Sequence, residues 1–475
     1  MSKKNELPAL VAALVVTLGV LGAGGLWLKD NIKFDPAPGP IATGPGESND
    51  DQRQRGSYKD YYTGQSVLPE EVSPAKQAGL SALAAGDYET AVATFTTVLA
   101  EKKNDPESLI YLSNAQIADE EAYTIAVAVP ADKEFLGPAL EILRGVAQAQ
   151  LEINEAGGVN GVPLRVLLAA DEGEETSFET ASALVETKAV LGVVGHYSSD
   201  MTLAAAEAYE VGKLPVISPT STAESISDAG AYVFRTVPSD RLATATLSRY
   251  VLEDLDKTQA AVFYTSDSAY SLSVRREFTT ELLSNGGEVV ADFDVAKAGY
   301  STRNALEAAQ EAGAEVIMLA LTEETDDASI QILTVNQKAL PVIGGDSLYD
   351  YNILEVGGEN AVGLTVSVPW HILNYQQSPF VQSSLALWGA SVNWRTVTAY
   401  DAVVTLAEAI TLVGDDREAI AQAMSESGFR VEGATSLVKF FPSGDRNQPS
   451  QLVTIVKKES GGISSGTGYD YEPVR

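Results

Sequence analysis

The sequence predicts an α/β protein of two lobes, each built on a doubly wound parallel sheet, joined by a hinge and preceded by a transmembrane helix and a short α-helical repeat segment. Strand and helix patterns alternate regularly from residue 121 to about residue 458, and they do so in two successive series. Near the N-terminus, a long apolar stretch without charges is followed by a segment rich in Pro, Gly and Ser. These observations divide the chain into residues 1–28, 29–72, 73–120, 121–458 and 459–475.

The composition limits the kinds of partner and chemistry. The formal net charge of −33, from 65 acidic and 32 basic residues, argues against binding to nucleic acid or to an anionic membrane surface. There is no cysteine, which excludes disulfides and thiol chemistry. No phosphate loop, zinc-protease motif or calcium loop is present, and no G-x-S-x-G motif surrounds Ser198 or Ser199. We therefore expect no enzyme activity, no catalytic residue, no cofactor and no metal site.

Residues 1–28 are expected to be a membrane anchor or a signal. Leu7 to Leu28 is a run of 22 residues without a charge, and its length suits a spanning helix better than the shorter core of a cleaved signal peptide. Lys3 and Lys4 favour a cytoplasmic N-terminus, so the bulk of the chain would be exported. Residues 29–72 have too little apolar content to fold alone and are expected to be a disordered linker. Cleavage of the N-terminal stretch stays open.

Residues 73–120 have a helical pattern with small residues at regular intervals. Gly79, Gly86, Ala91 and Phe95 fall at the spacings of a tetratricopeptide repeat, which this segment resembles. Only one and a half repeats are present, whereas about three are normally needed for independent stability. Two interpretations stay open: a surface that binds a protein partner, or a helical cap packed on the next domain or self-associating.

The main body has strand patterns that end in small polar residues. An apolar run stops at Gly195 before Ser198 and Ser199, and a second short strand leads into Ser218–Thr222. The carboxyl ends of parallel strands meet at one edge of the sheet, and helix N-termini there attract anions. This stretch therefore predicts half of a pocket for a small carboxylate. Expected strands are 123–129, 164–170, 189–194, 215–218, 260–264, 288–294, 316–321, 341–344, 364–368 and 452–457; expected helices include 137–155, 178–187, 243–255, 305–312, 397–413 and 417–427.

The body resembles type I periplasmic solute-binding proteins of the branched-chain amino-acid (leucine/isoleucine/valine-binding) family. The motifs that carry the resemblance occur in order, at residues 153–164 (INEAGGVNGVPL), 193–196 (VVGH), 217–222 (ISPTST), 234–236 (FRT) and 344–346 (GGD). The resemblance implies the two-lobe periplasmic-binding-protein type I fold. It also implies capture of an amino acid or related small carboxylate for an ABC-type permease.

The resemblance also implies roles for individual residues. Ser199 matches the serine whose hydroxyl holds the α-carboxylate, and Thr222 matches the threonine that, with backbone groups near Thr220, contacts the carboxylate and the ammonium group. Tyr270 matches an aromatic lid from the second lobe. Asp346 matches an acidic partner of the ammonium group. The other candidates for the ligand site are Phe135 and Tyr197, in the pocket for the ligand side chain, and Ser198, next to Ser199.

Structural roles are the alternative for three of these residues. Ser199 could only cap the following helix, Asp346 could only shape its turn, and Tyr270 could be ordinary packing. Thr322 and Tyr197 differ from the residues of leucine-type relatives, so leucine is not a safe guess for the ligand.

The alternative function is a membrane-tethered sensor or scaffold that recruits a partner through residues 73–120. The expected location is the outer side of the cytoplasmic membrane. Residues 459–475, rich in Gly and Ser, are expected to be a flexible tail.

Overall fold

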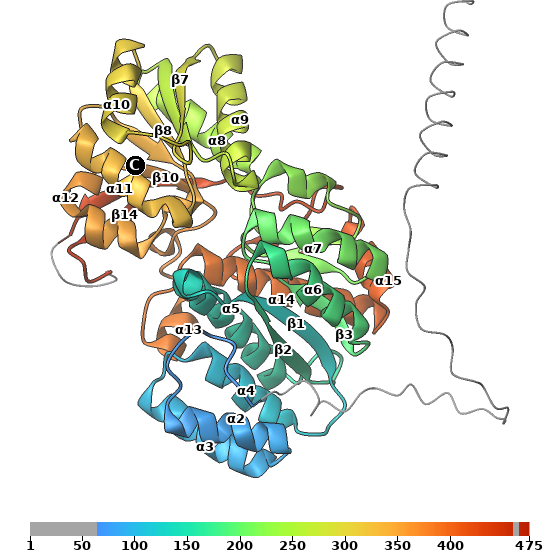
Figure 1. Ribbon diagram of the computed structural model, residues 1–475. Coiled ribbons are helices and arrows are strands. Elements are labelled where there is room, and N and C mark those ends of the chain that lie inside the picture. Colours follow the sequence, from blue (N-terminus) through green and yellow to red (C-terminus); the bar gives the residue numbers. More distant parts are fainter. Residues whose placement is uncertain (1–63, 459–464, 475) are drawn as a thin grey trace, which may run out of the picture. The chain divides into compact units, whose positions relative to one another are not determined.

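The computed structural model describes residues 64–458 and 465–474, and two lobes are visible in Figure 1. The predicted anchor and most of the predicted linker lie outside these residues. The predicted strands of the body are confirmed to within one or two residues at each end.

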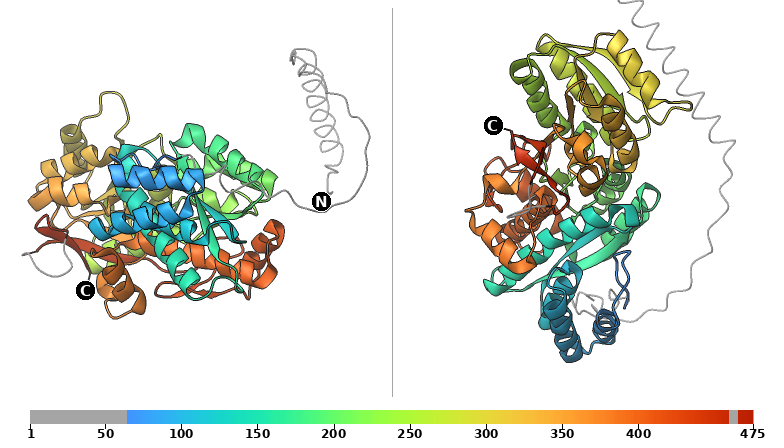
Figure 2. Two further views of the ribbon diagram at one scale, coloured as in Figure 1. Left: turned by 90° about the horizontal axis from the view of Figure 1, so that it is seen from below. Right: turned by 90° about the vertical axis from the view of Figure 1, so that its left-hand side faces the viewer.

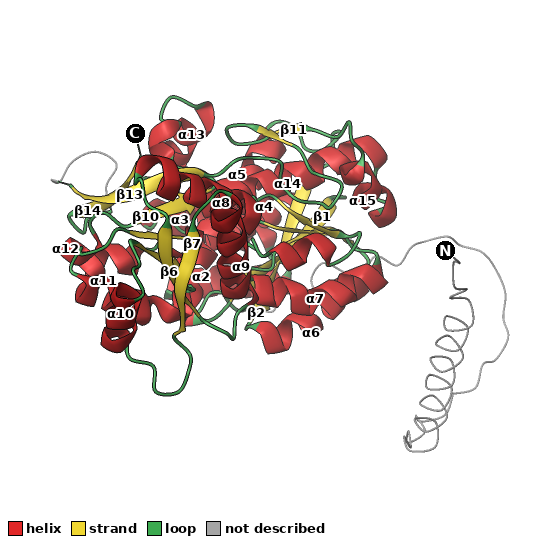
Figure 3. Cartoon of the chain, turned by 90° about the horizontal axis from the view of Figure 1, so that it is seen from above, coloured by secondary structure: helices red, strands yellow, loops and turns green. Residues whose placement is uncertain are grey.

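The first lobe contains a five-stranded parallel sheet in the order β2-β1-β3-β4-β5. Alternate residues of β1 point to opposite faces: Ile125 and Val127 join the core under α5 and α14, and Ala126 and Ala128 join the core under α6 and α7. Both faces are therefore covered by helices (Figure 3), as a parallel sheet requires. The elements are β1 Tyr123–Pro130, β2 Leu164–Asp171, β3 Val190–Val194, β4 Val216–Ser218, β5 Val233–Arg235, α5 Leu136–Glu155, α6 Glu174–Glu186, α7 Ser199–Gly212, α13 Pro379–Trp388, α14 Trp394–Val413 and α15 Arg417–Ser425.

The second lobe contains a seven-stranded sheet in the order β14-β13-β10-β9-β8-β6-β7. Ala260 and Val262 of β6 face the core under α8 and α9, and Ala261 and Phe263 face the core under α10 and α11. The elements are β6 Gln259–Tyr264, β7 Glu288–Asp294, β8 Val316–Ala320, β9 Val342–Gly344, β10 Thr365–Val368, β13 Gln451–Lys457, β14 Tyr469–Pro473, α8 Asp240–Arg249, α9 Ala269–Ser284, α10 Thr302–Glu311, α11 Asp326–Asn336 and α12 Gly358–Ala361.

Two predictions about the second lobe are wrong. Its sheet is mixed, because β13 and β14 run antiparallel to their neighbours. Tyr469–Pro473 were assigned to a flexible tail but pair with β13, and Tyr471 is buried and donates a hydrogen bond to the carbonyl of Leu348. The alternation of aromatic and acidic residues in this segment is a strand pattern with one buried side chain, which its short length concealed.

The chain passes between the lobes three times. It enters the second lobe between β5 and α8, returns between β10 and α13, and enters the second lobe again between β12 (Leu437–Val438) and β13. β12 pairs with β11 (Val431–Glu432) in a short hairpin of the first lobe. These crossings form the predicted hinge.

Residues 73–120 form three helices, α2 Pro74–Ala85, α3 Tyr88–Glu101 and α4 Pro106–Ile117, at the end of the first lobe (Figures 1 and 2). Phe95 of α3 is fully buried, and a Cβ at Gly79 of α2 would meet its ring at 2.9 Å. α4 covers the edge strand β2: Asn114 accepts a hydrogen bond from the N–H of Val166 and donates one to its carbonyl.

The predicted linker ends earlier than residue 72. Glu107 at the start of α4 accepts hydrogen bonds from the Val67 backbone N–H at 2.8 Å and from the Ser66 hydroxyl at 2.6 Å. Leu68 is buried against the first lobe, and Lys76 forms buried ion pairs with Asp105 and Glu107. The last residues of the segment are thus held by contacts that its polar composition did not reveal.

Among the described residues, α14 alone has the length and apolar composition of a membrane-spanning helix. Within its most apolar window, 67% of the residues are buried inside the protein, and it packs along α5 in the first lobe. α14 is accordingly a core helix.

Candidate functional site

A cavity of about 450 Å³ lies between the lobes, at the carboxyl ends of strands from both sheets. Seven of the eight predicted ligand residues line it, and Thr222 is the exception. Its lining from the first lobe includes Phe135, Tyr197, Ser198, Ser199, Asp200 and Thr220; from the second lobe, Asp267, Ser268, Tyr270, Thr322, Glu323, Glu324, Asp346 and Ser347; and from the start of α14, Trp394 and Arg395.

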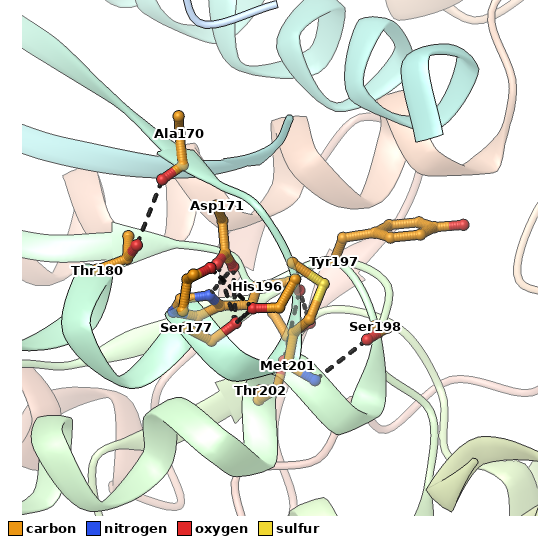
Figure 4. Close-up of polar contacts among 12 residues, drawn as sticks. Ala170, Asp171, Ser177, Thr180, His196, Tyr197, Ser198, Met201 and Thr202 are labelled. Carbon is orange, nitrogen blue, oxygen red and sulfur yellow. Dashed lines mark hydrogen bonds and ion pairs between the residues drawn. The ribbon is translucent and has the colours of Figure 1, made fainter. Parts of the chain in front are cut away.

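The two serines after β3 have different roles. Ser198 is the N-cap of α7, since its hydroxyl accepts a hydrogen bond from the Met201 N–H at 3.1 Å (Figure 4). Ser199 is buried at the first position of the helix, and its hydroxyl accepts from the N–H of Ala223 at 3.2 Å. The capping role considered for Ser199 therefore belongs to Ser198, and the Ser199 hydroxyl remains able to donate to a ligand.

The second hydroxyl turn follows β4. Thr220 lines the cavity, and its hydroxyl donates to the Tyr197 carbonyl at 2.5 Å, which holds the two turns together. Thr222 is buried next to Asp240 and is not among the residues that line the cavity. The carbonyl of the following residue, Ala223, accepts a hydrogen bond from the buried Arg235 guanidinium at 2.8 Å.

Tyr270 and Asp346 face each other at the cavity wall of the second lobe. The Tyr270 hydroxyl donates to Asp346 Oδ1 at 3.1 Å. A Cβ at Gly345 would come within 2.1 Å of that hydroxyl oxygen, so the glycine before Asp346 allows the approach. Asp346 begins a short 3-10 turn directly after β9, which places its carboxylate at the end of the strand. Both residues thus contribute to the cavity as well as to local packing.

Burial controls the ionisation of Asp346. Desolvation raises its pKa to about 6, although Arg395 and the hydrogen bond from Tyr270 act in the opposite direction. Behind it, burial and the neighbouring Asp346 raise the pKa of Asp240 to about 7. The ionised form of a carboxylate that is shielded from water in this way is stabilised by any cationic group that enters the cavity.

The cavity wall also contains two residues that the sequence analysis missed, Glu323 and Arg395. The Tyr197 hydroxyl donates to Glu323 Oε2 at 2.5 Å, and the Arg395 guanidinium pairs with the other Glu323 oxygen. Phe135 packs on Tyr197 with ring centroids 5.1 Å apart. Glu323 directly follows Thr322, which the sequence already marked as different from leucine-type relatives. Arg395 lies two residues before the predicted start of its helix at residue 397. Neither residue stood out from the local pattern.

Hydrogen bonds join the lobes directly around the cavity. Asp200 of α7 accepts from the Ala269 N–H at 2.8 Å and from the Ser268 hydroxyl at 3.1 Å, both at the start of α9. Ser273 accepts from the Glu224 N–H at 3.0 Å, and Glu323 is bonded by both Tyr197 and Arg395. The two lobes are thus in direct contact at the cavity.

His196 lies outside the cavity in a buried polar cluster (Figure 4). Its Nδ1 pairs with Asp171, and its Nε2 lies 2.8 Å from the Tyr209 hydroxyl. Ser177 donates to Asp171 at 2.9 Å and makes no bond to the histidine. The cluster ties β2, β3, α6 and α7 together, and its serine is not arranged as a nucleophile beside a base.

The part of the chain that the structure describes contains no group of His, Asp and Glu side chains suited to hold a metal ion. The cavity offers instead hydroxyl groups and one helix N-terminus on one side, and a carboxylate with an aromatic hydroxyl on the other. Donors can bind an anion while the carboxylate binds a cation, which is the arrangement that a zwitterion requires.

Comparison with known proteins identifies relatives of the same architecture. The chain is 25% identical over 311 residues to a leucine-, isoleucine-, valine-, threonine- and alanine-binding protein of Pseudomonas aeruginosa, covering 63% of this chain and 81% of that one. An amino acid binding protein of the same organism is 29% identical over 163 residues, 34% of this chain and 43% of its own length. The structure of an ABC transporter substrate-binding protein from Desulfitobacterium hafniense in complex with Leu superposes with a TM-score of 0.62 at 24% identity, covering 74% of this chain and all of that one.

The periplasmic binding protein family matches residues 136–462, which is more than half of the chain. The match extends through both lobes and includes the cavity-lining residues other than Phe135. The chain belongs to the periplasmic binding protein family.

Proposed function

We propose that this protein is an extracytoplasmic solute-binding protein that captures an amino acid or a closely related small carboxylate and delivers it to an ABC-type transporter. The observation that carries the proposal is the convergence of Ser199 and Thr220 from one lobe with Tyr270 and Asp346 from the other on a single cavity. The α-carboxylate would bind the Ser199 hydroxyl and the N–H groups at the N-terminus of α7, and the ammonium group would bind Asp346.

Calorimetric titration of the full chain with the common amino acids tests this proposal. At least one amino acid should bind saturably, and Ser199→Ala should weaken it about tenfold or more, because one buried donor to the carboxylate is lost. Ser182→Ala is the matched control, since Ser182 lies on α6 outside the cavity lining and its hydroxyl donates to the Phe178 carbonyl of the same helix. Binding that is unchanged in Ser199→Ala would refute the carboxylate site.

We further propose that the N-terminal apolar stretch is retained as an anchor that holds the protein at the outer face of the cytoplasmic membrane. The family supports a periplasmic or extracellular location, and the 22 uncharged residues have the length of a span. Intact-mass measurement of protein from native membranes decides between retention and cleavage. A mature chain that starts near residue 25 would contradict retention.

A partner-binding role for α2–α4 is the second candidate. Its support is the outward position of α2 and α3 at the end of the first lobe, with α4 against β2 (Figures 1 and 2). A protein that co-purifies with the full chain, and is lost when exposed α3 residues such as Glu89 and Thr97 are changed to Arg, would favour recruitment. A permease-dependent uptake defect in a deletion strain would favour delivery.

A further inference from the structure

A second buried carboxylate of the cavity wall, Glu323, follows β8, the strand next to the one that Asp346 follows. Glu323 has a side chain that is 7% exposed, and it lies between the Tyr197 hydroxyl and the Arg395 guanidinium, whose side chain is 4% exposed. Arg395 is held in turn by the Tyr349 carbonyl, 3.2 Å from Nη1, and it stacks over the Trp394 ring at 4.5 Å. Figure 4 shows the Tyr197 ring pointing away from the His196 cluster.

The two carboxylate oxygens of Glu323 can each accept a further hydrogen bond from a group in the cavity. A carboxylate offers about four acceptor sites on its two oxygens. Tyr197 occupies one site on Oε2 and Arg395 one on Oε1, so each oxygen can accept from another donor. A hydrocarbon group placed against these oxygens would exclude water without replacing its hydrogen bonds, which is unfavourable for binding.

The charged side chains around the cavity also disfavour a ligand side chain that ends in a carboxylate. Among the described residues that line it, Arg395 is the only basic side chain, and the acidic ones are Glu174, Asp200, Asp267, Glu323, Glu324 and Asp346. A ligand whose side chain ends in a carboxylate would meet repulsion from Glu323 and would have to compete for Arg395. A side chain that ends in an N–H group would be attracted.

We propose that the ligand is an α-amino acid whose side chain ends in an N–H donor (a carboxamide, ureido, guanidinium or ammonium group), and that Glu323 determines this specificity. This proposal rests on the proposed function, because it uses the same cavity. Asp346 and the α7 hydroxyls bind the α-amino acid core, while Glu323 accepts hydrogen bonds from the side chain. Tyr197 and Arg395 are positioning residues that hold the Glu323 carboxylate in place.

Competition among amino acids on the unmodified full chain is the first test. Calorimetry should show that the tightest of glutamine, citrulline, lysine and arginine binds at least tenfold more tightly than leucine, isoleucine and valine. Glutamate, which has the shape of glutamine but lacks its donor, should bind at least tenfold more weakly than glutamine. Tighter binding of leucine, or equal binding of glutamine and glutamate, would overturn the inference.

Substitution of the carboxylate is the second test. Glu323→Gln keeps the size of the side chain, and it should reduce the preference for the donor ligand over leucine by at least tenfold. Glu307→Gln is the matched control, since Glu307 is exposed on α10 of the same lobe, does not line the cavity and should leave the preference unchanged. An unchanged preference in Glu323→Gln would also overturn the inference.

The two tests separate this inference from the proposed function. A protein that binds only apolar amino acids keeps the proposed function and refutes the role of Glu323. A protein that binds none of these amino acids refutes both. If Glu323→Gln does not fold, the ligand comparison on the unmodified chain still decides.

Discussion

At the scale of single residues, the cavity depends on groups whose ionisation is set by burial. Asp346 is 6% exposed, and its carboxylate accepts a hydrogen bond from the Tyr270 hydroxyl at 3.1 Å. The ionised carboxylate lies in a poorly hydrated space, where a positively charged group would stabilise it. An α-ammonium group would pair with the Asp346 carboxylate, whereas a ligand without an amine would leave it without a positively charged partner.

We expect Asp346→Asn to weaken binding of an α-amino acid by roughly 10²-fold or more, because loss of one member of a buried ion pair costs about 3–5 kcal/mol. The matching deaminated acid should lose much less, since it does not use the carboxylate. Calorimetric titration of both ligands measures the difference. Equal losses for the two would mean that Asp346 organises the cleft without binding the amine.

Affinity should also depend on pH. Desolvation raises the pKa of Asp346 to about 6, so the carboxylate is mostly ionised above pH 6 and mostly protonated below it. Because only the ionised form pairs with an ammonium group, affinity for the amino acid should fall about tenfold per pH unit below pH 6. Asp346→Asn is the control for other groups that titrate nearby, such as Glu323 and Asp240. A fall of the same steepness in that variant would assign the effect to those groups.

At the scale of elements, α4 takes the place of a further strand at the edge of the first sheet. Asn114 bonds both backbone groups of Val166 and also accepts from Gln150 at 2.9 Å. The edge of β2 is thereby closed by a helix side chain, and unpaired strand groups are not left in the core. This contact favours the interpretation of the helical segment as a cap that is integral to the first lobe.

Asn114→Ala should lower the free energy of unfolding by about 2–4 kcal/mol, because two buried backbone groups lose their partner. Ligand affinity should change little, since α4 does not reach the cavity. Thermal denaturation of ligand-free protein measures the effect. Asn285→Ala, an exposed position at the end of α9, is the control. A melting temperature as high as that of the control would show that water or another group satisfies Val166.

At the scale of the whole described molecule, closure depends on contacts that the lobes make directly. Asp200 at the start of α7 accepts hydrogen bonds from the first residues of α9. A carboxylate at a helix N-terminus is stabilised by the helix dipole and by the free N–H groups there. This contact stabilises the closed state in addition to any bound ligand.

Asp200→Ala should therefore shift the ligand-free protein toward the open state and weaken ligand binding by roughly fivefold to tenfold. Small-angle X-ray scattering should show a larger radius of gyration for the ligand-free variant, and saturating ligand should remove the difference. Glu175→Ala, at the start of α6, is the control for a general effect of charge. A variant with unchanged scattering and reduced affinity would indicate that Asp200 contacts the ligand directly.

The sequence by itself determined the alternation of strands and helices, the hydroxyl turns after β3 and β4, and the position of Asp346 after β9. These features are local: apolar runs of strand length end in small polar residues, and strand ends of a parallel sheet meet at one edge. Seven of the eight predicted ligand residues line one cavity for this reason.

The tertiary structure alone decided the features that depend on contacts between distant segments. Tyr197 meets Glu323, 126 positions away, only because the lobes close on each other. β14 pairs along the edge of β13, and Thr222 lies beside the buried Asp240, outside the cavity lining. Such pairings depend on how two surfaces fit together, and no periodicity within either segment encodes the partner.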